Sequence, residues 1–215
     1  MSASAFTWTD AEVRSALVAA AGVLARLGAD VEEVSLPMLP SAGAAFMALC
    51  DSEGAARHLP WLRARPLDYD QGTRRRLLAA ALLPAALVQK AQQARALVRR
   101  QILDALGDHD VLLAPTSHRP APTIAGFTAP ITSKAEAASR FFTRRSFTTP
   151  AALAGAPALA VPCGFSQAGL PLSLQIMGRP FDDATVLRVG HAYEQATEWW
   201  QRRPEADPTS RGTRA

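Results

Sequence analysis

The sequence of 215 residues contains little cysteine, little lysine and no long apolar run. Its two cysteines, Cys50 and Cys163, stand far apart and outside any metal-ligand spacing, which argues against a disulfide framework and against a zinc site. The longest apolar run, 77–88, is interrupted by a proline and falls short of the roughly 20 residues of a membrane span. The first ten residues have neither the basic nor the apolar region of a secretory signal. We therefore expect a cytoplasmic chain with no metal, no cofactor and no membrane contact.

Basic residues outnumber acidic ones by 23 to 19, which gives a formal net charge of +4 and a pI near 9.7. Such a balance can indicate binding to nucleic acid. However, only Lys90 and Lys134 are lysines, and the arginines are scattered, with short clusters at 74–76 and 99–100 that contain no interleaved aromatic residue. Because no nucleic-acid-binding motif accompanies the charge, we interpret it as a compositional bias and expect no nucleic-acid partner.

Helical and strand patterns alternate along the chain, which indicates a layered α/β fold. The chain opens with a predicted capping box, Thr9 with Glu12, then a helix that ends at Gly28, and then a short strand at 31–37. Further helices are expected at 41–64, 73–106 with a break at Pro84, 133–147 and 182–200, and further strands at 110–116, 158–162 and 171–178. We predict no domain boundary within 1–200 and a disordered tail at 201–215.

Three segments of the second half resemble the C-terminal part of the amidase signature enzymes, a family that includes bacterial amidases and the A subunit of the aspartyl/glutamyl-tRNA amidotransferase. They are DVLLAPT (110–116), TTPAALAGAPALAVPCGF (148–165) and GLPLSLQIMGRPFDDATVLRVGHAYEQATEW (169–199). The prolines of the second segment argue against a helix there, and we interpret 154–157 as a tightly packed turn before a buried strand. Upstream, LARLGADVEEVSLP and RRRLLAAALLPAALVQKAQQAR fit as well, so the resemblance covers nearly the whole chain.

The resemblance implies a mixed β-sheet flanked by helices, of which 1–200 would be the C-terminal part. It also implies amide hydrolysis by a Ser–cis-Ser–Lys triad, in which a neutral lysine takes the nucleophile's proton through a bridging serine and a glycine-rich loop stabilises the oxyanion. The family carries these residues in its N-terminal half. No stretch here reads Gly-Gly-Ser-Ser-Gly-Gly, Lys90 lies within a helix, and Lys134 follows Ser133 in a polar loop. We therefore assign no catalytic residue and expect the chain alone to be inactive.

Two positions remain as candidates for substrate binding, Arg76 and Ser146. The resemblance implies that Arg76 matches an arginine that binds the substrate's α-carboxylate, and arginine can hold a carboxylate through two parallel hydrogen bonds. A plain helix-surface residue is the alternative. Ser146 stands where the amidotransferase subunits have an aspartate that binds the substrate's amino group, which argues against glutamine as substrate and favours a general amidase.

Other nucleophile or base candidates are better explained as structural residues. Ser117 and His118 are sequence neighbours in a loop, His191 lies on the last predicted helix, Cys163 is a small packing residue, and Asp182 is a helix cap.

Several functions remain open. The chain is a truncated gene product or one half of a split amidase, and the alternative is a non-catalytic binding or complementation module that pairs with a separate N-terminal amidase half. Its partners would be that half or a second copy of the chain, and a small-molecule amide if the site is completed. A third possibility is a self-contained hydrolase that uses its own serine and lysine. An incomplete sheet would leave an unpaired edge and an apolar face, which favour aggregation or a partner.

Overall fold

The computed structural model describes residues 9–123, 133, 135 and 147–202. Its centre is a three-stranded sheet of β1 (Val111–Pro115), β2 (Ala158–Phe165) and β3 (Pro171–Gly178), in the order β1-β3-β2. Both strand pairs are antiparallel. The three strands predicted in this part of the chain and the α/β class are thereby confirmed.

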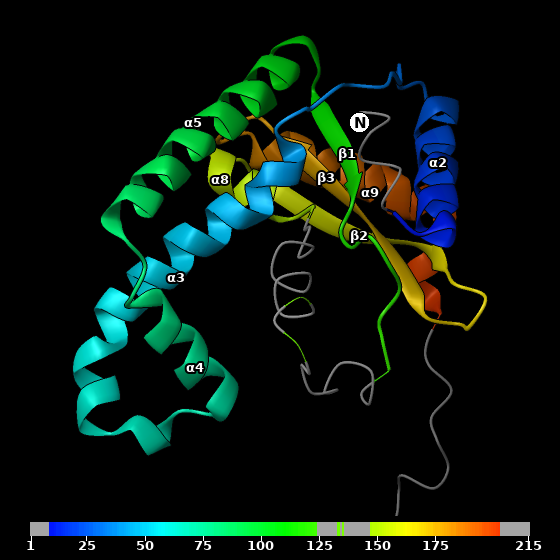
Figure 1. Ribbon diagram of the computed structural model, residues 1–215. Helices are drawn as coiled ribbons and strands as arrows, with labels where there is room; N and C mark the ends of the chain where they lie inside the picture. Colours follow the sequence, from blue (N-terminus) through cyan, green and yellow to red (C-terminus); the bar gives the residue numbers. More distant parts are fainter. Residues whose placement is uncertain (1–8, 124–132, 134, 136–146, 203–215) are drawn as a thin grey trace, which may run out of the picture.

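Helices cover both faces of this sheet (Figure 1). One face packs against α3 (Leu39–Ala64), α5 (Ala85–Asp108) and α8 (Thr149–Ala154), and the other against α2 (Ala11–Arg26) and α9 (Asp183–Thr197). Because successive strand residues point to opposite faces, the register separates two apolar clusters. Leu112 and Met177 face α5, whereas Leu113 and Ile176, which lie opposite each other across the strands, face α2 and α9.

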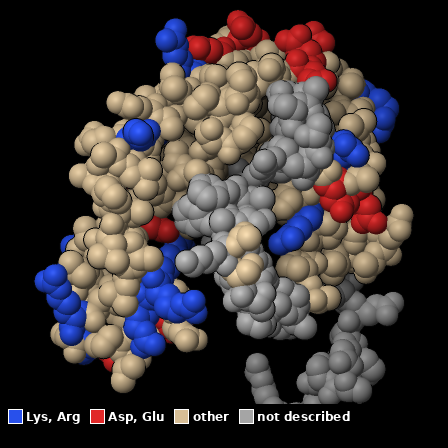
Figure 2. All heavy atoms as spheres, viewed as in Figure 1, with Lys and Arg blue, Asp and Glu red and all other residues tan. Residues whose placement is uncertain are grey.

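An arm projects from this body (Figure 1). It consists of the second half of α3, a short 3-10 turn (Pro66–Asp68) and α4 (Gln71–Ala80), which folds back on α3. The helix predicted over 73–106 is interrupted at Pro84, as expected, because Pro84 is the residue that precedes the first turn of α5. Figure 2 shows basic side chains gathered over the arm and acidic ones over the opposite end of the same face.

The first helix confirms its predicted end but corrects its predicted start. Asp10, not Thr9, is the N-cap, and its carboxylate accepts a hydrogen bond from the Glu12 backbone N–H at 2.9 Å. The Glu12 side chain consequently does not close a capping box, and instead accepts from the backbone N–H of Gln167 at 3.3 Å. Gly28 ends the helix in a left-handed conformation with φ 95°, as its position predicts.

Two further predictions are wrong. Residues 29–36 run without regular secondary structure where a strand was expected at 31–37, and Val31 is 44% exposed. The segment has a strand-like sequence, but among the described residues no strand pairs with it, since a pocket separates it from β1. The prolines of TTPAALAG do not prevent a helix: Pro150 sits in the first turn of α8, where no amide donor is needed, and Gly155 ends the helix with φ 66°. The helix expected over 133–147 lies almost entirely outside the described residues. The tail predicted at 201–215 lies mostly outside them.

Candidate functional site

Arg76 lies on α4, at the inner side of the arm. The helix begins at Asp70, whose carboxylate accepts from the backbone N–H groups of Gly72 and Thr73 at 2.8 and 3.2 Å. One and a half turns later, the Arg76 Nε donates to Asp51 Oδ1 of α3 at 2.8 Å, and Nη2 forms an ion pair with the same oxygen. This hydrogen bond raises the pKa of Arg76, so its guanidinium is a permanent cation.

The pairing with Asp51 fixes one edge of the guanidinium and leaves the rest accessible. The Asp51 side chain is 11% exposed, whereas that of Arg76 is 49% exposed. A guanidinium has five N–H donors, and those on Nη1 take no part in the contact with Asp51. Arg76 is therefore a half-exposed cation whose orientation is fixed by Asp51. Ser146, the second predicted substrate contact, lies outside the described residues.

Two arginines of α5 bind the end of α8, the helix formed by the TTP segment. Arg95 Nε donates to the carbonyl of Leu153 at 3.2 Å, and Arg99 donates to the carbonyl of Ala154. Carbonyls at a helix C-terminus lack intrahelical partners and carry partial negative charge, so two cations here stabilise the short helix. The left-handed conformation favours glycine at position 155, where a Cβ would also lie 3.3 Å from Nη1, the flexible end of Arg99.

The other candidate groups are engaged in structural contacts or are protonated. Burial raises the pKa of the Cys163 thiol to about 11, and a thiol that stays protonated is a poor nucleophile. Burial, with help from Glu53 and Asp51, also raises the pKa of Cys50. Ser117 Oγ donates to the carbonyl of Arg119 at 2.7 Å.

The positions of the last helix agree with their predicted roles. Asp182 accepts from the Thr185 backbone N–H as the cap of α9, and His191 is exposed on the same helix. Lys90 is likewise exposed, on α5. None of these named groups is arranged as an activated nucleophile.

Within the described residues, no three or more His, Cys, Asp or Glu side chains gather closely enough to hold a metal ion. Over the same part of the chain, no helix has the length and apolar character needed to cross a membrane.

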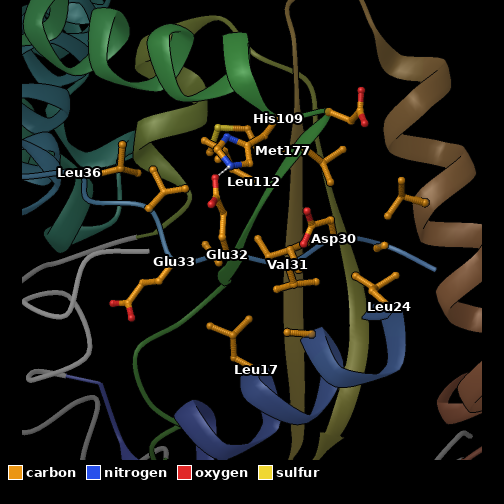
Figure 3. Close-up of a pocket in the computed structure, with 18 of the residues that line it drawn as sticks. Leu17, Leu24, Asp30, Val31, Glu32, Glu33, Leu36, His109, Leu112 and Met177 are labelled. Carbon is orange, nitrogen blue, oxygen red and sulfur yellow. Dashed lines mark hydrogen bonds and ion pairs between the residues drawn. The ribbon is translucent and has the colours of Figure 1, made fainter. Parts of the chain in front are cut away.

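A pocket of about 670 Å³ lies beside β1, between α2 and the segment 29–36 (Figure 3). Its walls come from both apolar clusters: Leu36, Leu112 and Met177 belong to one, and Leu17 and Leu24 belong to the other. The segment 29–36 contributes a carboxylate rim of Asp30, Glu32 and Glu33. The pocket is thus an apolar space with an acidic border, beside the edge of β1 that no described strand covers.

His109 ties that border to the end of α5. Its Nε2 lies 2.5 Å from Glu32 Oε1, and its Nδ1 lies 2.7 Å from the carbonyl of Ala105. Both ring nitrogens thus face acceptors, and the Ala105 carbonyl followed by Glu32 raises the pKa of His109. Sequence reasoning missed this pair, since 77 residues separate its members and neither has a motif around it.

Comparison with known proteins gives consistent matches along nearly the whole chain. The Amidase family model matches residues 3–187. The A subunit of glutamyl-tRNA(Gln) amidotransferase from Brevibacillus brevis is 34% identical over 220 residues, which cover 91% of this chain and 44% of that protein. Its counterpart from Lysinibacillus sphaericus is 37% identical over 216 residues, which cover 89% and 43%.

Solved structures agree with the sequence matches. The A subunit of glutamyl-tRNA(Gln) amidotransferase from Thermotoga maritima superposes with a TM-score of 0.68 at 29% identity, covering 87% of this chain and 39% of that one. A crystal structure of an amidase gives a TM-score of 0.72 at 30% identity and covers 87% and 42%. The chain therefore spans less than half the length of the relatives that it matches.

Proposed function

The chain belongs to the amidase family, and from that premise we propose that it supplies the C-terminal part of an amidase site, without the groups that cleave the carbon–nitrogen bond. Residues 1–200 would be this part of the domain, and the Ser–Ser–Lys triad would come from outside the chain. The observation that carries the proposal is the span of the match: 91% of this chain aligns with only 44% of a relative. By itself the chain is inactive, because an amidase without its nucleophile and base loses most of its rate enhancement.

The substrate side of the site is proposed around Arg76. Asp51 holds the guanidinium in place, and the basic arm around it (Figure 2) would attract an anionic substrate. Arg76 would then bind a carboxylate on the amide substrate, while Ser146, which lacks the charge of an aspartate, would not select an amino group. These features favour a general amidase over an enzyme restricted to glutamine.

The alternative is a non-catalytic module that complements a separately made N-terminal amidase half. The pocket beside β1 favours this alternative, because it places an apolar space at a sheet edge that no described strand pairs with. Both versions share one expectation: activity requires a second polypeptide segment. The two free thiols, Cys50 and Cys163, are consistent with work in the cytoplasm, which we include in the proposal.

Co-expression tests the proposal. The chain is produced alone and together with the part of the Brevibacillus brevis relative that it does not match, and both preparations are assayed on a panel of simple amides. We expect hydrolysis by the complex and none by the chain alone. Hydrolysis by the chain alone that disappears in Lys134→Ala, but not in the exposed-lysine control Lys90→Ala, would show a self-contained hydrolase and refute the proposal.

A further inference from the structure

The outer edge of β1 presents backbone groups that no described strand pairs with. The Thr116 N–H donates to the carbonyl of Ser173 in β3, and the Gly178 N–H donates the other way, to Pro157 ahead of β2. Hydrogen-bonding direction alternates along an antiparallel strand, so Leu112 and Ala114 point their backbone groups at β3. Val111 and Leu113 point theirs away from the sheet, toward the pocket that both residues line.

The pocket lies where one more strand would extend the sheet beyond β1, and its two walls continue the two apolar layers that cover the sheet. A strand beside β1 would present alternate side chains to two apolar layers, and the pocket has such layers on its two sides. Leu112 and Met177 mark one layer, and Leu113 and Leu17 mark the other. A ligand that merely filled an apolar cavity would not need this division, whereas a strand buried on both faces does.

The far side of the pocket is the segment 29–36, which no described strand pairs with. Its sequence predicts a strand, and among the described residues no backbone hydrogen bond joins 30–35 to β1. The contact between Glu32 and His109 holds the segment near the start of β1, as Figure 3 shows. Within the described part of the chain, β1 and the segment 29–36 therefore border the same apolar space without pairing across it.

We propose that this pocket is the slot for one β-strand of a separate polypeptide, the N-terminal amidase half. The inserted strand pairs with the outward groups of Val111 and Leu113 and extends the sheet by one strand. The inference rests on the proposed function, since it names where the second polypeptide attaches. It also specifies the chemistry of the strand: apolar on both faces, with flanking lysine or arginine opposite the carboxylates of Asp30, Glu33 and Asp108 at the pocket border.

The test uses the full chain and, as the probe, the unmatched part of the Brevibacillus brevis relative made as a separate polypeptide. Amide hydrogen exchange of the free chain should show Leu112 and Ala114 protected and Val111 and Leu113 exchanging faster. Addition of the probe should protect Val111 and Leu113. This measurement needs no mutation and so does not depend on the folding of a variant.

A matched pair of variants measures the contribution of the edge. Val111→Pro removes one outward N–H at the first residue of the strand, where proline is tolerated, and Val111→Ala truncates the side chain but keeps that N–H. We expect Val111→Pro to weaken binding of the probe about tenfold relative to Val111→Ala, with both variants melting near each other.

Four other results would each overturn the inference, and each has its own pattern of binding and amide protection. An active complex with equal affinity for both variants, and no new protection at Val111 or Leu113, would move the contact elsewhere while leaving the proposed function intact. Protection of these amides in the free monomer would show that the chain fills its own slot, and self-association lost in Val111→Pro would show a second copy in it. Failure of the wild-type chain to bind the probe would overturn the inference and the proposed function together.

Discussion

Gly178, the last residue of β3, should not tolerate even a methyl group. A Cβ at this position would lie 2.4 Å from Cγ2 of Val186 on α9 and 3.4 Å from the backbone carbonyl of Asp182. Val186 is 3% exposed and lies on a helix, where a β-branched side chain has one strongly preferred rotamer and cannot turn aside. Gly178→Ala must therefore push α9 away from the sheet.

The expected size of the effect follows from two opposing contributions. Overpacking a close contact costs about 1–3 kcal/mol, while replacing glycine by alanine in a strand recovers about 0.5–1 kcal/mol of backbone entropy. Taking the middle of each range, about 2 kcal/mol lost and about 0.75 kcal/mol recovered, the free energy of unfolding should fall by about 1.25 kcal/mol, which lowers the melting temperature of a chain of this size by about 2.5–5 °C. Circular dichroism at a helical wavelength measures this shift.

Two further variants make the reasoning refutable. Gly22→Ala is the matched control within α2, since its new Cβ would meet nothing closer than Arg26 Nη1 at 3.8 Å, and we expect a gain of about 0.5–1 kcal/mol. Val186→Ala should relieve the clash, so the double variant should be more stable than the sum of the two single changes predicts. A Gly178→Ala protein that melts at or above the wild-type temperature, or additive single and double variants, would refute the argument.

Three other predictions concern ionisable groups. The Ala105 carbonyl and Glu32 raise the pKa of His109, so the contribution of His109 to stability should be complete below about pH 6.5 and decline as pH rises through the raised pKa. The midpoint of urea unfolding, measured at a series of pH values, should show this decline in the wild-type chain and not in His109→Gln. The same pH profile in both proteins would contradict the prediction. Cys163, with a pKa of about 11, should react with iodoacetamide at pH 7.5 only after denaturation, and prompt labelling of Cys163 itself in the native chain, located by peptide mass mapping to separate it from Cys50, would show that the thiol is accessible. In the reconstituted amidase, Arg76→Ala should raise KM for carboxylate-bearing amides at least about tenfold with little change in kcat. The control Arg75→Ala, on the same helix, should leave KM nearly unchanged. An equal rise in KM in both variants would indicate only a loss of general positive charge.

Much of the fold could be predicted from local patterns. The strands at β1, β2 and β3 were identified because short apolar runs end at proline or glycine, and the break at Pro84 follows from the missing amide donor. The strand predicted at 31–37 was wrong for a reason outside its own sequence, because a strand forms only where a second strand lies beside it to pair with. Thr9 and Asp10 are both good caps, and sequence alone could not decide between them.

The candidate site shows the same division between local and long-range information. Arg76 was found through the family resemblance, yet its partner Asp51 lies 25 residues away on another helix and could be found only once α4 was seen to fold back on α3. The pair His109–Glu32 and the pocket beside β1 likewise depend on tertiary packing. Residue type predicted which groups could bind, and packing decided which of them are held in place.

The order β1-β3-β2 also has a consequence for how the chain is made. The central strand is the last of the three to be synthesised, and Val111 finds its partner Gly178 only after roughly 60–70 further residues, about 3–13 s of translation. Until then neither outer strand has a described neighbour, and the helices that precede β3, such as α3 and α5, can pack on one another but not on a completed sheet. The strands of the nascent chain therefore stay unpaired during this stretch of synthesis. Because unpaired strand edges favour aggregation, this is the period in which we expect chaperones to be most needed.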